Sequence, residues 1–248
     1  MPRLSRIIQA GFYHVINRGV ERRVVFYEED DFDTFLDILN LACIKYNITL
    51  HAFCLMNNHY HLLIETKEEN LSKAMKYINE NYAVYFNKRY NRSGHLWQGR
   101  FFSSLLFNDQ EHFWIVARYI EQNPIRANIV KQIDHYKYQS LFQLKYSQKY
   151  DNLLKNSDIL SMEIKSYQKF ITENTDCESQ VEQTYASPKI IKQNNKIKVL
   201  TKKIDSFFDK YIDNKTSISN AFNYGYSKTD IANFTNLSAP AISKILKR

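Results

Sequence analysis

Hydrophobic and polar residues alternate with two different periods over the first half of the chain. Four short segments indicate strands, the first of them because it alternates and is rich in β-forming residues, and three longer segments indicate helices, with apolar residues at helical spacing in the first two. The predicted strands cover residues 11–18, 49–55, 59–65 and 101–107, and the predicted helices cover residues 30–46, 71–90 and 110–122. Asn123 and Pro124 are expected to end the third helix, because the residue before a proline avoids the helical conformation. The order β-α-β-β-α-β-α predicts an α+β domain of the ferredoxin-like, split βαβ kind, with helices packed on a mainly antiparallel sheet.

The pattern weakens after about Ser140. Residues 145–195 are polar and rich in Lys, Ser, Asn and Gln, which indicates peripheral helices and a linker, and periodicity returns over residues 197–212. We therefore expect a main domain over residues 1–140, a connecting part over residues 141–195 and a small domain over residues 196–248.

The end of the chain carries the capping signals of two short helices joined by a turn. A capping box opens the first helix, a turn follows, and a serine caps the second helix, which has a proline in its first turn. The residues that give these signals are Ser227, Asp230, Asn236, Leu237, Ser238 and Pro240. The pattern predicts a small all-α helix-turn-helix domain with Lys244 and Lys247 near the outward face of its second helix. A plain helical hairpin is the alternative.

The positive charge of the chain is confined to this end. The net charge is +8, and residues 185–248 hold 12 Lys and Arg but 4 Asp and Glu, whereas residues 1–184 hold 22 of each. Such an excess is expected of a segment that contacts a polyanion, although a solvated lysine-rich surface would look the same. Its coincidence with the predicted helix-turn-helix favours DNA binding.

Other features of the composition exclude several classes of protein. The uninterrupted apolar stretches are too short to span a bilayer, and no apolar run follows the basic start as it would in a secretory signal. The three cysteines have no paired spacing, so we expect a reducing, cytoplasmic location and no cysteine-based metal site. We expect no membrane partner and no small-molecule substrate.

The sequence His59-Tyr60-His61 lies in a predicted strand. Alternate side chains of a strand share a face, so both imidazoles point the same way and Tyr60 points away. Two histidines so placed can bind one divalent ion, although a single His-x-His is more often incidental than a metal site.

A second group of polar residues lies at the end of the third predicted helix. Tyr119 and Asn123 are four residues apart and therefore share a helical face. The Asn123 amide can supply an oxygen ligand, and a phenol beside a bound cation can act as a nucleophile. The alternative is that Tyr119 is an ordinary tyrosine and Asn123 only caps the helix.

The two groups occur in order with two further motifs, and together the four resemble a known family. The segments that carry the resemblance are Gly11-Phe-Tyr-His-Val-Ile-Asn-Arg-Gly19, Met56-Asn-Asn-His-Tyr-His-Leu-Leu-Ile64, Gly94-His-Leu-Trp-Gln-Gly-Arg-Phe101 and Tyr119-Ile-Glu-Gln-Asn-Pro-Ile-Arg-Ala127. Over roughly residues 8–140 the chain resembles the REP-associated tyrosine transposases, relatives of the single-tyrosine transposases of insertion sequences in the HUH nuclease superfamily.

The resemblance implies a metal-dependent nuclease and strand transferase acting on single-stranded DNA near hairpins of palindromic repeats. His59 and His61 match the metal-binding pair, Asn123 the third ligand and Tyr119 the nucleophile that forms a 5′-phosphotyrosine. Insertion-sequence relatives carry Gln four residues after the tyrosine, where this chain has Asn123. Gln122, one position earlier, is therefore the alternative third ligand. The donor set suits Mg²⁺ or Mn²⁺ better than Zn²⁺. A monomer is favoured, although the oligomeric state is open.

Basic and aromatic residues near these motifs are candidate DNA contacts, because arginines hold phosphates and aromatic rings stack on unpaired bases. They are Arg18, Arg22, Arg23, His95, Trp97 and Arg100. Trp97 fits the core as well as it fits a stacking platform. His14 has no assigned role, and His112 lies seven residues before Tyr119 on the same helical face. A catalytically inactive regulator that binds DNA hairpins is the main alternative function, and an RNA-processing enzyme is a third.

Overall fold

The computed structural model describes residues 9–106, 110–147, 149–173, 181, 189–193, 196–200, 204–208 and 213–246. The chain forms two compact units, one made of residues 8–186 and one that includes residues 187–248. Each unit is described by itself. No helix in the described ranges has the length and apolar character that crossing a membrane requires.

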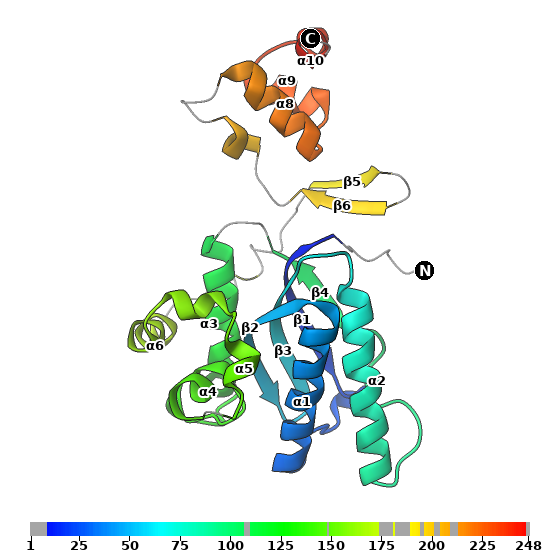
Figure 1. The fold of residues 1–248 in the computed structure, drawn as a ribbon, viewed down its shortest axis with the longest axis vertical. Helices are drawn as coiled ribbons and strands as arrows, with labels where there is room; N and C mark the ends of the chain where they lie inside the picture. Colours follow the sequence, from blue (N-terminus) through cyan, green and yellow to red (C-terminus); the bar gives the residue numbers. More distant parts are fainter. Residues whose placement is uncertain are drawn as a thin grey trace. The chain divides into compact units, whose positions relative to one another are not determined.

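The first unit is built on a four-stranded antiparallel sheet (Figure 1). Its strands are β1 (Gly11–Arg18), β2 (Ile48–Met56), β3 (His59–Thr66) and β4 (Phe102–Leu105). They lie in the order β2-β3-β1-β4, so β1 and β3 form the centre. This order, with every neighbouring pair antiparallel, confirms the predicted α+β, split βαβ fold.

Two long helices, α1 (Glu29–Tyr46) and α2 (Leu71–Arg89), cover one face of the sheet side by side (Figure 1). The odd positions of β1 and the even positions of β3 supply the sheet's part of this core. For example, the buried Tyr60 ring packs against Phe35 of α1 with ring centres 4.9 Å apart. The apolar stripe of each helix, predicted from its spacing, is the face that is buried. The short 3₁₀ helix η1 (Val20–Arg22) connects β1 to this layer.

The opposite face of the sheet is covered by α3 (Gln110–Arg126), which packs with α4 (Ser140–Tyr146) and α6 (Ile164–Thr172) in one hydrophobic core. The short helices α5 (Asp151–Leu154) and η2 (Asp158–Ser161) contact β2. Residues between α3 and α4 also protect the edge of the sheet, because the Leu55 amide donates to the Tyr138 carbonyl at 2.9 Å. The residues after Ser140 thus belong to the core that holds α3 on the sheet.

The predicted end of the third helix is wrong, since α3 continues through Pro124 to Arg126. Proline has no amide hydrogen to donate to the carbonyl four residues earlier, which belongs to Ile120. The Asn123 side chain compensates, because its Nδ2 lies 3.4 Å from that carbonyl and 2.8 Å from the Tyr119 carbonyl.

The second unit contains a β-hairpin and a small group of helices. The hairpin is formed by β5 (Lys189–Gln193) and β6 (Lys196–Leu200), and the helices are η3 (Ile204–Phe207), α8 (Asn214–Tyr224), α9 (Lys228–Thr235) and α10 (Ala239–Leu246). The hairpin was not predicted. Its second strand alternates Lys196, Ile197, Lys198 and Val199, a pattern that favours a strand over a helix.

The capping signals at the end of the chain correspond to real helix ends. Ser227 and Asp230 form a reciprocal capping box at the start of α9. Asn236 ends α9 in the left-handed conformation, with φ of 56°, and the Ala241 amide donates to Ser238 Oγ at the start of α10. Buried Ile218, Ile231 and Ile242 join α8, α9 and α10 in one core, so the C-terminal region is mostly helical, as predicted.

Candidate active site

The two histidines of the His59-Tyr60-His61 motif lie on the face of the sheet that α3 covers. Strand β3 pairs with β1 so that His59 is opposite Arg18 and His61 is opposite Ile16. The two imidazole rings are 5.0 Å apart between centres. The alternation of the strand therefore places both rings on one face, as the sequence indicates.

Helix α3 brings Tyr119 to the same place from far along the chain. The centre of its half-buried ring lies 5.7 Å from the ring centre of His61. The guanidinium of Arg126 lies over the Tyr119 ring, 4.7 Å from its centre. The sequence did not single out Arg126. This residue lies two helical turns after Tyr119, beyond the predicted end of the helix.

A third histidine, His14 of β1, completes the cluster. Its Nε2 lies 2.9 Å from Nδ1 of His61, the two rings are stacked, and its ring centre is 5.7 Å from that of Tyr119. Sequence reasoning left His14 without a role. The sequence does show that His14 and Arg18 lie on the same face of the first strand. This placed His14 near the motif histidines only once β1 was known to pair with β3.

The surroundings keep all three imidazoles neutral at pH 7. Burial lowers the pKa of His14 to about 3, and burial with the nearby charge of Arg18 lowers the pKa of His59 to about 4. Burial, followed by the neighbouring His14, His59 and Arg126, holds the pKa of His61 well below its usual value. A neutral imidazole carries the lone pair that a metal ligand needs.

Hydrogen bonds also fix the orientation of the His59 and His61 rings. Nδ1 of His59 lies 2.6 Å from Oδ1 of Asn58, and Asn58 is itself held by its Nδ2, which donates to the Arg22 carbonyl at 3.1 Å. Nδ1 of His61 is engaged by His14. If both Nδ1 atoms carry the proton, the Nε2 lone pairs are left for a ligand, which is how second-shell partners usually orient metal-binding histidines.

These residues fit a divalent cation, with two neutral imidazoles whose rings are already oriented. Within the described ranges, no group of three or more His, Cys, Asp or Glu side chains is arranged as a metal site. A complete site would therefore need a further donor of another kind, such as an amide, water or a phosphate oxygen.

The two candidate amides point to different partners. Asn123 Nδ2 donates to the helix carbonyls of Tyr119 and Ile120, and the described residues give its Oδ1 no hydrogen bond. Gln122 Nε2 instead donates to the Ile171 carbonyl at 2.7 Å, at the end of α6. Gln122 thus connects two helices, whereas Asn123 lies on the side of α3 that carries Tyr119.

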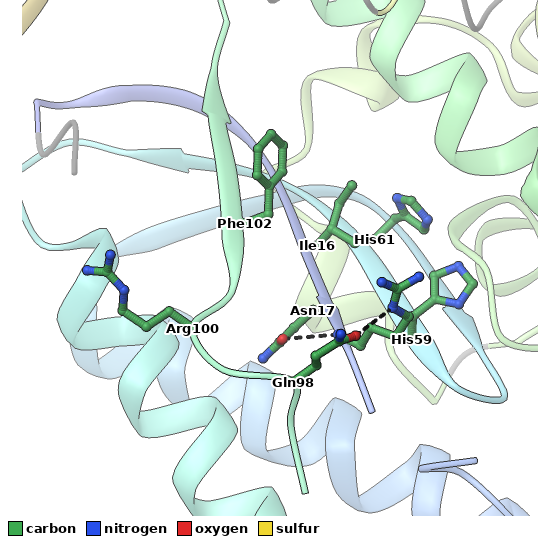
Figure 2. Close-up of a pocket in the computed structure, with 8 residues that line it drawn as sticks. Ile16, Asn17, His59, His61, Gln98, Arg100 and Phe102 are labelled. Carbon is green, nitrogen blue, oxygen red and sulfur yellow. Dashed lines mark hydrogen bonds between the residues drawn. The ribbon is translucent and has the colours of Figure 1, made fainter. Parts of the chain in front are cut away.

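A cavity of about 470 Å³ opens beside the histidines (Figure 2). The residues that line it are Ile16, Asn17, Arg18, His59, His61, Gln98, Arg100 and Phe102. Two of the predicted DNA contacts, Arg18 and Arg100, are among them, and Figure 2 shows Arg100 extending away from the two histidines. Gln98 and Phe102 were not singled out from the sequence. His112, although half-buried on α3, is not a lining residue.

The other predicted DNA contacts have different environments. Trp97 is only 8% exposed and its Nε1 donates to the Asn79 carbonyl, so it is a core residue and does not offer a stacking surface. Arg23 pairs with Glu21, and Arg22 and His95 are exposed. Lys244 is exposed on α10, and Lys247 lies outside the described residues.

A transposase family and two solved structures are similar to this chain. Residues 8–123 match the family of IS200-like transposases. The structure of a REP-associated tyrosine transposase bound to a REP hairpin is similar, with 16% identity, a TM-score of 0.50, and coverage of 58% of this chain and 84% of that chain. A protein from Deinococcus radiodurans described as a transposase matches with 21% identity, a TM-score of 0.34, and coverage of 49% of this chain and 97% of that chain. A search of curated protein sequences found no significant match.

The family match covers β1 to α3, the elements that carry the three histidines, Tyr119 and Asn123. The solved transposase has the same α+β fold. The family resemblance that the four motifs predicted is therefore confirmed: residues 8–123 match the IS200-like transposase family, and the fold is that of a solved REP-associated tyrosine transposase.

Proposed function

We propose that this protein cleaves and rejoins single-stranded DNA next to hairpins, with Tyr119 as the nucleophile. The observation that carries the proposal is the contact of the Tyr119 ring with His61 and His14, since a tyrosine from a distant helix lies against an oriented pair of neutral histidines. A buried structural tyrosine would not need such neighbours. The alternative of an inactive regulator does not account for this arrangement.

His59, His61 and Asn123 would hold a Mg²⁺ or Mn²⁺ ion, with Gln122 as the alternative third ligand. The Asn123 oxygen suits this part because its amide nitrogen is already fixed by the helix end, whereas Gln122 is engaged with α6. When bound, the ion would polarise the scissile phosphate and offset its charge.

Tyr119 would act by transesterification. Its Oη attacks the phosphorus in line, forming the Oη–P bond while the P–O3′ bond breaks. The phenol loses its proton and the leaving 3′ oxygen gains one, so the products are a 5′-phosphotyrosine and a free 3′-OH. Attack by another 3′-OH reverses the step and rejoins strands, so neither water nor ATP is consumed. Arg126, already over the Tyr119 ring, supplies positive charge beside the developing phenolate character.

The DNA partner is proposed from chemistry and similarity together. The solved transposase of the same fold is bound to a REP hairpin. In this chain, Arg18 and Arg100 line the cavity beside the histidines, and residues 185–248 carry the excess positive charge. We infer that the α9–α10 pair binds DNA as a helix-turn-helix, with exposed Lys244 near its contact surface.

The test is covalent capture of DNA. The full chain is incubated with Mg²⁺ or Mn²⁺ and labelled hairpin oligonucleotides that have randomised single-stranded flanks, and adducts are detected on denaturing gels. Tyr119→Phe should abolish the adduct and preserve hairpin binding, because only the attacking oxygen is removed. Tyr27→Phe, at a tyrosine that is 57% exposed and whose ring packs against Phe86 and Tyr90, is the matched control and should keep the adduct.

Metal dependence is tested in the same assay. Excess chelator, His59→Ala and His61→Ala should each remove the adduct, because too few ligands are left to hold the ion. A Tyr119→Phe protein that still forms the adduct would overturn the assignment of the nucleophile. A wild-type protein that binds hairpins tightly and captures no DNA would support the inactive regulator instead.

A further inference from the structure

Phe102 is a large apolar side chain that remains exposed beside the proposed active site. It lies on β4, is 56% exposed, and lines the same cavity as His59 and His61. Single exposed apolar residues are common and need no explanation by themselves. The position of Phe102 in the register of the sheet makes this one informative.

Phe102, Ile16 and His61 form a row across three neighbouring strands. Phe102 pairs with Ile16 of β1, and Ile16 pairs with His61 of β3, so all three side chains lie on one face (Figure 2). Neighbouring strands are about 4.8 Å apart, which puts Phe102 about 10 Å from His61 along the sheet. One nucleotide of an extended strand can bridge that distance.

Polar groups in the same cavity match the other parts of a nucleotide. Gln98 is held in place twice, since its backbone N–H donates to the Arg18 carbonyl at 2.8 Å and its side-chain Oε1 accepts from Arg18 Nε at 3.1 Å. Its Nε2 has no hydrogen bond within the described ranges and can donate to the edge of a base. The exposed Arg18 guanidinium stands opposite His59 and can contact a phosphate.

We propose that this cavity is a subsite for one unpaired nucleotide next to the scissile phosphate, with its base stacked on Phe102. Arg18 holds the phosphate between the stacked nucleotide and the histidines, and Gln98 contacts the base edge. The inference rests on the proposed function for the position of the scissile phosphate. It assigns the stacking surface to Phe102, because the predicted platform, Trp97, is buried.

The first test follows base stacking without any chemistry. Phe102→Trp is made in the full chain, and tryptophan fluorescence is titrated with a short oligothymidylate and with an abasic oligonucleotide of the same length. Stacking should quench the new fluorescence above the background of Trp97 and Trp114, and the abasic strand should not. Equal quenching by the two strands would overturn the proposal.

The second test measures affinity by fluorescence anisotropy. Phe102→Ala should weaken oligothymidylate binding about 5-fold or more, because stacking on an aromatic ring contributes about 1–3 kcal/mol per base. Phe102→Tyr should bind within about twofold of the wild type. Leu41→Ala, at a residue of α1 that is 54% exposed, is the control and should have no effect. If Phe102→Ala also had no effect, the subsite would be wrong.

The third test uses the captured substrate and separates the two proposals. An abasic site next to the cleaved phosphate should reduce adduct formation by the wild type but add little to the defect of Phe102→Ala. Adduct formation that is indifferent to Phe102 would reject the subsite and leave the nuclease intact. If bases stacked on Phe102 but no adduct formed, the proposed cleavage by Tyr119 would be rejected and the nucleotide subsite would be supported.

Discussion

His14 and His61 are joined by a hydrogen bond of 2.9 Å between Nε2 of His14 and Nδ1 of His61, in the part of the sheet that Tyr119 covers. The low pKa of His14, about 3, keeps this ring neutral, so that its Nε2 can accept the proton of His61 Nδ1. The Nε2 lone pair of His61 then faces any ligand. His14 is thus a positioning residue for a proposed metal ligand.

This relationship predicts different outcomes for two substitutions of His14. His14→Leu removes the acceptor and leaves a buried N–H of His61 without its partner, so Mn²⁺ should bind about 10- to 100-fold more weakly. His14→Gln supplies an amide oxygen that can accept the same proton and should restore part of the affinity. Electron paramagnetic resonance of free Mn²⁺ measures both. Equal affinities of the wild type and His14→Leu would contradict the positioning role.

The contacts of Asn123 and Gln122 predict that their alanine variants fail in different ways. Gln122→Ala should lower the free energy of unfolding by about 0.5–1.5 kcal/mol, because it removes the hydrogen bond to the Ile171 carbonyl, with little change in Mn²⁺ affinity. Asn123→Ala should weaken Mn²⁺ binding as well, since it removes the proposed oxygen ligand. Denaturant unfolding and Mn²⁺ titration of the two proteins give the comparison. The reverse pattern would assign the third ligand to Gln122.

Local patterns predicted the elements of the first unit well. The first strand begins and ends at the predicted residues, and the alternation of β3 places His59 and His61 on one face. The capping box of Ser227 and Asp230 was readable because its hydrogen bonds join residues close in sequence. Family motifs, more than periodicity, brought Tyr119 into the same hypothesis.

Features that depend on distant residues were not predicted. The role of His14 requires the pairing of β1 with β3, and the burial of Trp97 requires its contact with Asn79 of α2. The continuation of α3 through Pro124 depends on the Asn123 side chain, which a general rule about proline does not include. Likewise, His51 is an extra residue at a bulge between β2 and β3, which only the register of the pair reveals.

His51 also predicts how stability depends on pH. Burial lowers its pKa to about 4, although Asp158 and the Glu65 carboxylate, 3.9 Å from its Nε2, favour the proton. Below about pH 6.5 the unfolded chain therefore binds a proton that the folded protein does not. The free energy of unfolding should fall between pH 6.5 and 4, by up to about 1.4 kcal/mol per pH unit for this group.

The matched variant is His51→Asn, which keeps an acceptor for the Asp158 amide that now donates to His51 Nδ1 at 3.0 Å. At pH 7.5, the difference in the free energy of unfolding between the variant and the wild type measures the change in packing alone. Its decrease in stability from pH 7.5 to 4.5 should then be smaller than that of the wild type by up to about 2.5 kcal/mol. Urea unfolding at several pH values measures this difference, and parallel pH curves would show that His51 does not titrate as expected.

The second unit should supply salt-dependent DNA affinity rather than chemistry. The proposed nucleophile and metal ligands all precede Pro124, whereas residues 185–248 hold the whole excess of positive charge. Deleting residues 187–248 should weaken hairpin binding and flatten its salt dependence, and the remaining unit, which has its own core, should still capture DNA at high substrate concentration. For every phosphate that the protein no longer binds, the slope of log affinity against log salt concentration should fall by about 0.7–0.9.

Two single substitutions make this prediction specific to one surface. Lys244→Gln removes an exposed charge of α10, the proposed reading helix, and Lys215→Gln removes an exposed charge of α8 in the same unit. Because both lower the net charge equally, a general attraction between the unit and DNA would make them equivalent. A helix-turn-helix interaction requires Lys244→Gln to lower the salt slope by the amount expected for about one phosphate and Lys215→Gln to leave it nearly unchanged. The truncated protein and both substituted proteins could instead bind hairpins with the same dependence of log affinity on log salt concentration as the wild type. In that case, α9 and α10 would be better explained as a packing or protein-interaction element.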